Sequence, residues 1–100
     1  MWQPISLAEL QELVANELQR CTQNQKEAFA RFQVPFYLVP IYRFRNLESV
    51  WVVAKLPPGL LYYEDVEEGF ELGVLDEDGA LQDHGCNQYE LSHVLAQAGF

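Results

Sequence analysis

The residue types most suited to catalysis gather near the end of the chain, where His84-Gly85-Cys86 is followed by His93. Imidazole nitrogens and a thiolate are zinc ligands, and a histidine can also activate a nearby thiol as a nucleophile. The spacing matches no zinc-binding pattern, and a fourth ligand is missing unless Asp83 supplies it. The alternative is an ordinary half-buried cysteine flanked by solvated imidazoles. His84, Cys86 and His93 therefore form one hypothesis, that of a small metal- or thiol-dependent enzyme.

The acidic segment Asp76-Glu77-Asp78-Gly79 invites comparison with a calcium-binding loop. Such a loop needs acids at positions 1, 3 and 5, glycine at position 6 and a glutamate at position 12. Counting from Asp76 places Ala80 at position 5 and Asn87 at position 12, so the comparison fails. Asp-Gly tolerates the positive φ angles of tight turns, and the segment is predicted to be a hairpin turn.

Charge is distributed very unevenly along the sequence. The chain has 6 basic and 15 acidic residues and a net charge of −9. All six basic residues lie at or before Lys55, so residues 1–55 carry +1 and residues 56–100 carry −10. Ion pairs within the second half cannot relieve this imbalance. We expect a negative surface that attracts basic partners and repels nucleic acid and anionic lipid.

A second hypothesis follows from this charge, namely a non-enzymatic module that binds a basic protein through a face rich in carboxylates. Such interfaces favour aromatic anchors, and Tyr63 directly precedes the densest acidic run. The structural alternative is a set of solvated loops that keep the protein soluble. The analogy with acidic immunity or inhibitor proteins rests on composition alone. The candidate partner-binding residues are Tyr63, Glu64, Asp65, Glu67, Glu68, Glu71, Asp76, Asp78 and Asp83.

Several classes of function are not expected. The sequence contains no phosphate-binding loop, dinucleotide fingerprint, nucleophile elbow or HExxH motif, and no cofactor is expected. The acidic balance argues against binding nucleic acid. No apolar run approaches the roughly 20 residues that span a bilayer, and the start lacks the features of a secretory signal. Two cysteines do not make a disulfide framework, so we expect a cytoplasmic protein.

Hydrophobic spacing predicts helices at both ends of the chain. Ser6 to about Gln23 has apolar residues at helical spacing, and Ser6 followed by Glu9 forms a capping box. Residues 26–33 predict a second short helix or a bent extension of the first. Asn87, with Glu90 three places on, predicts the N-cap of a last helix that ends at Gly99. Cys21 lies on the apolar stripe of the first helix and is expected in the core.

The middle of the chain predicts a sheet. Phe36–Arg45 is β-branched and aromatic, and Pro40 predicts an edge strand or a bulge at that residue. The next strand, 50–55, should be central, with residues 51 and 53 on one face and 50, 52 and 54 on the other. Residues 60–63 are a candidate start of a third strand. Residues 70–74 alternate like a half-buried strand, and 80–84 form a short return strand.

Consecutive strands with short connections favour an antiparallel meander. We predict one α+β domain over residues 1–100, with a four-stranded antiparallel meander. The N-terminal helix, or two helices, and the C-terminal helix should pack on one face of the sheet. A third hypothesis is a homodimer that uses Trp2 and the edge at Pro40 as contacts.

Overall fold

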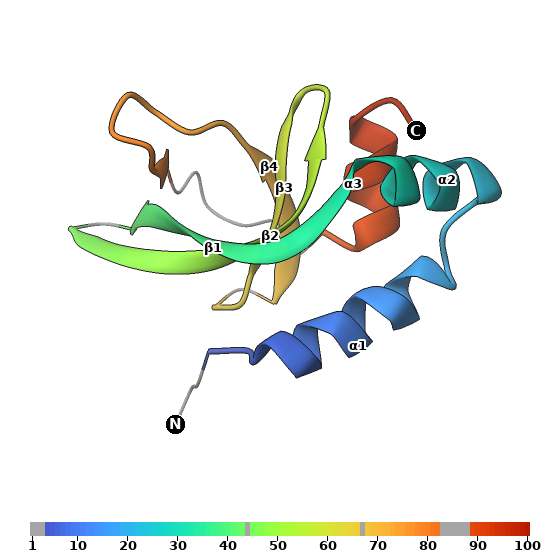
Figure 1. Cartoon of the computed structure of the whole chain (residues 1–100), viewed down its shortest axis with the longest axis horizontal. Coiled ribbons are helices and arrows are strands. Elements are labelled where there is room, and N and C mark those ends of the chain that lie inside the picture. The colour runs from blue at the N-terminus through green and yellow to red at the C-terminus, as the bar shows by residue number, and fades with distance from the viewer. Residues whose placement is uncertain (1–3, 44, 67, 83–88) are drawn as a thin grey trace.

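The computed structural model describes residues 4–43, 45–66, 68–82 and 89–100. The order of elements is α1 (Leu7–Leu18), α2 (Gln23–Phe32), β1 (Gln33–Arg43), β2 (Asn46–Leu56), β3 (Gly59–Glu64), β4 (Gly69–Gly73), β5 (Leu81–Gln82) and α3 (Leu91–Gln97). In Figure 1 the β1–β2 hairpin projects to the side opposite α2 and α3. The predicted α+β class is confirmed.

Reciprocal caps define the starts of the first two helices. The Ser6 hydroxyl accepts a hydrogen bond from the Glu9 amide at 3.1 Å, and the Glu9 carboxylate accepts one from the Ser6 amide at 3.1 Å. The predicted capping box is therefore confirmed. The predicted continuation of this helix to Gln23 is wrong, because Thr22 and Gln25 form a second capping box that starts α2. Thr22 followed three residues later by Gln25 is itself a capping-box signature.

The last helix is capped by a residue far away in the chain. Its N-cap residue is Glu90, which makes no side-chain cap bond. The Leu91 amide instead donates to the Glu17 carboxylate of α1 at 3.1 Å. A carboxylate is favoured at a helix start because free amides and the helix dipole both attract it. The predicted cap, Asn87, lies outside the described residues, and the predicted start there is wrong because α3 begins at Leu91.

The sheet has five strands in the order β4-β3-β2-β1-β5. Strands β1 to β4 form an antiparallel meander with β2 in the middle, as predicted for that strand. The four-stranded, fully antiparallel prediction is wrong, because β5 pairs parallel to β1 through Ile41 with Leu81 and Tyr42 with Gln82. The turn at Asp76–Gly79 does form, and Gly79 has a φ of 78°, but it does not connect two paired strands.

A bulge in β2 determines which residues face the helices. The register between β2 and β3 shifts by one residue between Val52 and Ala54, which leaves Val53 as the extra residue. Val53 and Ala54 therefore both pack in the helix-side core, while Val50 and Val52 pack on the opposite face. The prediction that Ala54 shares a face with Val50 and Val52 is wrong for this reason.

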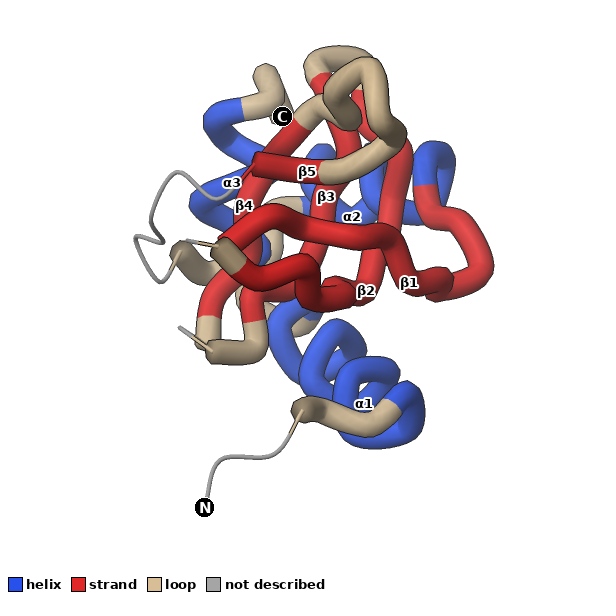
Figure 2. Tube along the Cα trace, turned by 90° about the vertical axis from the view of Figure 1, so that its left-hand side faces the viewer, coloured by secondary structure: helices blue, strands red, loops and turns tan. Residues whose placement is uncertain are grey.

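Apolar clusters cover both faces of the curled sheet. On one face, all three helices pack against the sheet, around Leu10, Phe29, Leu95 and Phe70, as predicted. On the other face, a smaller cluster includes Leu81, which the curl of the sheet brings against β4. A Cβ atom added to Gly73 would lie 2.9 Å from a Leu81 methyl carbon. Figure 2 shows β5 crossing in front of β3 and β4.

Pro40 lies in a regular part of β1. The irregularity in the β1–β2 register falls between Gln33 and Tyr37. Of the two alternatives predicted for Pro40, the bulge is therefore not observed. β5 pairs only with Ile41 and Tyr42, which leaves the outer side of β1 without a β5 partner at Pro40. This is the edge position in which a residue without an amide proton is tolerated.

Candidate functional site

Glu64 of the predicted acidic face lies inside the protein. It ends β3, is 1% exposed, and its Oε1 atom lies 2.7 Å from Nη2 of Arg43 at the end of β1. The Arg43 Nε atom also donates to Glu48 at 3.2 Å. Nη2 and Oε1 of the buried pair are close without meeting hydrogen-bond geometry. Glu64 therefore has no exposed charge to offer a partner, because the fold has already paired it with a cation.

Tyr63 is also part of the core. It is buried and packs edge-on against Phe70, with ring centroids 5.1 Å apart. Its place in the alternation of β3 puts it on the helix side of the sheet, together with Leu61. Tyr63 therefore cannot act as an exposed aromatic anchor in this structure.

Asp65 directly follows β3 and binds Ile5, two residues before α1. Its Oδ2 atom accepts a hydrogen bond from the Ile5 amide at 3.2 Å. The Ile5 carbonyl in turn accepts a hydrogen bond from the indole nitrogen of Trp51 at 3.3 Å. Both backbone groups of Ile5 are therefore hydrogen-bonded to side chains, one from β2 and one from the residue after β3. Asp65 is half-buried, and its hydrogen bond with Ile5 gives it a structural role.

The remaining predicted residues of the β3–β4 region differ in exposure. Glu68 is exposed and adopts a left-handed backbone with a φ of 57°. Glu71 is half-buried in β4, opposite Tyr62. Glu67 lies outside the described residues. Of the predicted carboxylates described in the β3–β4 turn, Glu68 is the most exposed.

The second acidic loop, residues 74–80, is organised around Asp76. One carboxylate oxygen accepts hydrogen bonds from the amides of Asp78 and Ala80, and the other accepts one from Gln82 at 2.6 Å. The hydrogen bonds from the Ala80 amide and the Gln82 side chain lower the pKa of Asp76 below its usual value. Asp78 is exposed. Asp83, the last predicted member, lies outside the described residues.

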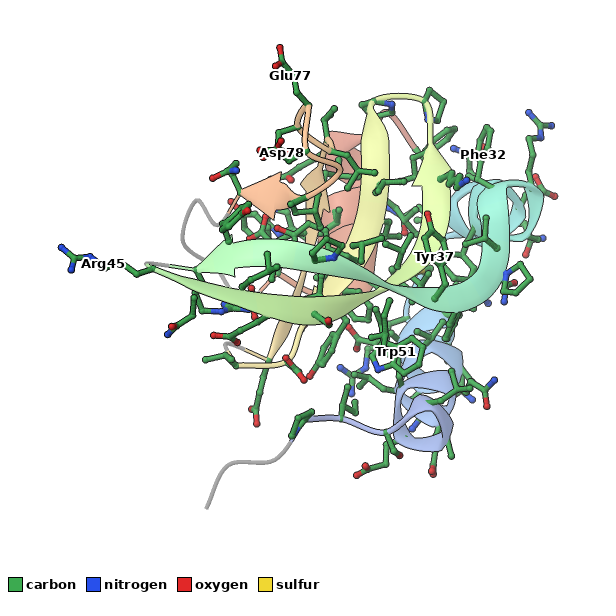
Figure 3. All side chains as sticks on the ribbon, turned by 60° about the vertical axis from the view of Figure 1, so that its left-hand side comes forward. Phe32, Tyr37, Arg45, Trp51, Glu77 and Asp78 are labelled. Carbon is green, nitrogen blue, oxygen red and sulfur yellow. The ribbon has the colours of Figure 1, made fainter. Side chains whose placement is uncertain are left out.

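These acidic residues form two separate sites rather than one face. The β3–β4 turn and the 74–80 loop leave opposite ends of β4, whose five residues span roughly 13 Å from first to last. Figure 3 shows Glu77 and Asp78 on the side of the sheet opposite Trp51. A single continuous wall of carboxylates is therefore not present among the described residues.

The candidate enzyme site is only partly visible. His84 and Cys86 lie outside the described residues. His93 is exposed on α3, and its ring stacks on Tyr89 with centroids 4.4 Å apart. Within the described ranges there is no group of three or more histidine, cysteine or acidic residues that could hold a metal ion.

The structure also shows a groove that the sequence did not predict, which we call the Trp51 groove. It has a volume of about 580 Å³ and lies between the start of the chain, the β1–β2 hairpin and the end of β3. Its apolar lining comes from Pro4, Ile5, Leu38 and Trp51. Ser49, Glu48 and Asp65 complete it. The alternation of Leu38, Pro40 and Tyr42 was the available sequence signal, but it did not show that this face lacks a covering helix.

Comparisons with protein-family models, curated proteins and solved structures found no match. Among the described helices, none is both long and apolar enough to cross a lipid bilayer.

Proposed function

We propose that this protein is a non-enzymatic interaction module that binds a basic protein. The main supporting observation is that two loops expose acidic side chains while most basic side chains lie elsewhere. Glu68 on the β3–β4 turn and Glu77 and Asp78 on the 74–80 loop are exposed. The single basic residue shown to reach a described carboxylate after Leu56 is Arg43, which pairs with Glu64 inside the protein.

Four of the other five basic residues lie away from these two loops, whereas Lys55 lies at the end of the sheet where the 74–80 loop leaves β4, since Lys55 pairs with Leu60 and Leu60 with Gly73. Lys26 and Arg31 are exposed on α2, and Arg20 lies between α1 and α2, where it pairs with Glu17 at 3.5 Å. Arg45 lies at the far tip of the β1–β2 hairpin, as Figure 3 shows. Lys55 lies over the Tyr37 ring near the end of β2. Figure 1 places α2 on the opposite side of the molecule from the 74–80 loop.

This arrangement supports electrostatic recognition. Exposed charges of one sign accelerate the encounter with an oppositely charged partner and disfavour like-charged competitors. Contacts of this kind weaken when salt shortens the screening length. The partner is therefore expected to be basic, and its capture should depend on ionic strength.

Matched charge variants test the proposal. Glu68→Gln with Glu77→Gln removes one charge from each acidic loop, and Glu12→Gln with Glu27→Gln removes two exposed charges from the helices. Both pairs change the net charge from −9 to −7, since each substitution adds +1. Capture of basic proteins at low salt should fall about threefold or more for the loop pair and change little for the helix pair.

The same capture repeated at about 0.5 M salt completes the test, because screening is then much stronger. Partners should be lost at high salt. Retention that is equal at both salt concentrations, or equal for the two variant pairs, would show that loop charge does not drive recognition.

A further inference from the structure

Three aromatic rings lie in a row on the helix side of the sheet, at the edge formed by β4. Tyr63 of β3 pairs with Phe70 of β4, and Phe70 forms an antiparallel bridge with Tyr89, just before α3. The Phe70 amide donates to the Tyr89 carbonyl at 2.9 Å, and His93 stacks on the Tyr89 ring. Tyr63 and Phe70 are buried, whereas Tyr89 is half-buried. The row therefore ends in an aromatic side chain that solvent can reach.

Residues of α1 and of the β3–β4 turn join this row to form a pocket. It has a volume of about 270 Å³, and its apolar lining consists of the three rings and Leu13 of α1. Its polar lining is Glu17 of α1, Glu68 of the turn and Glu90 beside Tyr89. Drug-sized ligands occupy pockets of roughly 300–1,000 Å³. This pocket is smaller, so its size suits one side chain of a partner.

The charge of this pocket has one sign. Its described lining contains three carboxylates and no basic residue. Glu17 is already engaged, because it accepts a hydrogen bond from the Leu91 amide and lies 3.5 Å from Arg20. The carboxylates of Glu68 and Glu90 are exposed and form no hydrogen bond or ion pair with the described residues. These two charges are therefore available to a ligand of the pocket.

The bridge between Phe70 and Tyr89 brings Glu68 and Glu90 to the same end of the aromatic row. In an antiparallel pair, residues before one partner lie beside residues after the other. Glu68 precedes Phe70 by two positions, and Glu90 directly follows Tyr89. Both charges attract a positive group placed between them. Among the described residues, three such carboxylates do not come together as a metal site, which favours a larger organic cation.

We infer that this pocket binds an arginine side chain of the basic partner, with the guanidinium group between Glu68 and Glu90 and beside the Tyr89 ring. The inference rests on the proposed function and specifies its recognition site. A guanidinium ion is planar, stacks on aromatic rings and donates paired hydrogen bonds to carboxylates, whereas an ammonium ion is more strongly hydrated. An aromatic wall with two unpaired carboxylates therefore suits arginine in particular.

Titration with a short peptide, followed residue by residue by NMR, tests this assignment. The probe is a glycine–arginine–glycine peptide with blocked ends, and the control peptide carries citrulline, the uncharged isostere of arginine. The arginine peptide should bind with a dissociation constant of about 1 mM. It should shift the amide signals of Leu13, Gly69 and Leu91 more than those of the 74–80 loop. The citrulline peptide should bind at least about tenfold more weakly, because it lacks the positive charge.

Two pairs of matched variants locate the binding. Glu90→Gln in the pocket is compared with Glu77→Gln on the 74–80 loop, since both residues are exposed and both changes remove one negative charge. Tyr89→Leu is compared with Tyr42→Leu, a tyrosine of the β1–β2 hairpin that is 40% exposed. Each pocket variant should weaken the arginine peptide about threefold or more, through a lost carboxylate or cation–π contact. Each control should stay within about 1.5-fold, and unfolding midpoints confirm that all four variants are folded.

The opposite results overturn the assignment. Equal affinity for the two peptides would show that the pocket does not recognise positive charge, and a dissociation constant above about 20 mM would show that it takes no arginine. A response to Glu77→Gln in place of Glu90→Gln would move the site to the other acidic loop. The proposed function stands in these cases if the Glu68→Gln and Glu77→Gln pair still weakens the salt-sensitive capture of basic proteins. Capture that is equal for this pair and the helix pair would overturn the proposed function itself.

Discussion

Replacing Arg43 should destabilise the protein far more than replacing it together with Glu64. The Arg43 and Glu64 side chains are 8% and 2% exposed, and their nearest charged atoms are 2.7 Å apart. At an effective dielectric constant of about 20, the attraction at this distance is about 6 kcal/mol. Desolvation of the two ions costs several kcal/mol each and offsets most of it. The net contribution of the pair is therefore small, although each ion depends on the other.

This asymmetry fixes the expected magnitudes. Arg43→Leu strands a buried carboxylate and should lower the free energy of unfolding by about 3–5 kcal/mol. Glu64→Gln should cost about 1–2 kcal/mol, because Arg43 keeps Glu48 at 3.2 Å. The double variant Arg43→Leu with Glu64→Leu removes both charges and should cost less than about 1 kcal/mol, as buried pairs replaced by apolar residues commonly do.

Urea denaturation followed by tryptophan fluorescence and by circular dichroism measures all three variants. At a slope of roughly 1.5 kcal/mol/M, a loss of about 3–5 kcal/mol moves the midpoint down by about 2–3 M. Glu48→Gln is the control, since its partly exposed carboxylate should contribute no more than about 1 kcal/mol. A double variant as unstable as Arg43→Leu alone, or an Arg43→Leu variant within about 1 kcal/mol of wild type, would refute the reasoning.

Three further predictions concern single side chains. The lowered pKa of Asp76 stabilises the fold at pH values above the ordinary aspartate pKa of 3.8, and this stabilisation should disappear as the pH falls through the lowered pKa. The urea midpoint should therefore fall less on acidification for Asp76→Asn than for wild type. Burial and the nearby Glu17 carboxylate raise the pKa of Cys21, so mass spectrometry should find Cys21 alkylated by iodoacetamide more slowly than a model thiol, and equal rates would contradict this. Gly73→Ala places a Cβ atom 2.9 Å from Leu81 and should cost about 1–3 kcal/mol by the same unfolding assay, whereas a stabilised variant would show that the sheet relaxes freely.

Local chemistry made part of the fold predictable. Ser6 and Glu9 define the start of α1 through a bond between residues three apart, so the pattern is visible in sequence. The central position of β2 followed from apolar residues on both of its faces. Thr22 and Gln25 carry the same kind of signature, and it marks the start of α2 as a helix separate from α1, the first of the two alternatives predicted for residues 26–33.

Contacts between distant residues were not predictable in this way. The Glu17 carboxylate caps α3 from 74 residues away, and no local pattern announces it. The parallel pairing of β5 with β1 depends on the path of the 74–80 loop, whereas the Asp-Gly turn alone favours a hairpin. The extra residue Val53 reverses the alternation of β2, and a period-two pattern cannot show where a bulge falls.

The candidate site illustrates the same division. Net charge is a property of composition, and the acidic character of the second half survives folding on Glu68, Glu77 and Asp78. Which of the carboxylates remain exposed is decided by packing. Glu64 was indistinguishable from its neighbours in sequence, and only the pairing of β2 with both β1 and β3 brings Arg43 to it.

The position of Arg43 also explains why a strongly acidic half can belong to a stable fold. A buried carboxylate is costly unless a cation accompanies it, and Glu64 is the one acidic residue buried in the described part of the chain. Arg43, which lies in the first half, supplies that cation across the sheet. The acidic loops carry their charge in water, where like charges repel weakly. Their charge therefore costs the fold little, which is compatible with the partner binding that we propose.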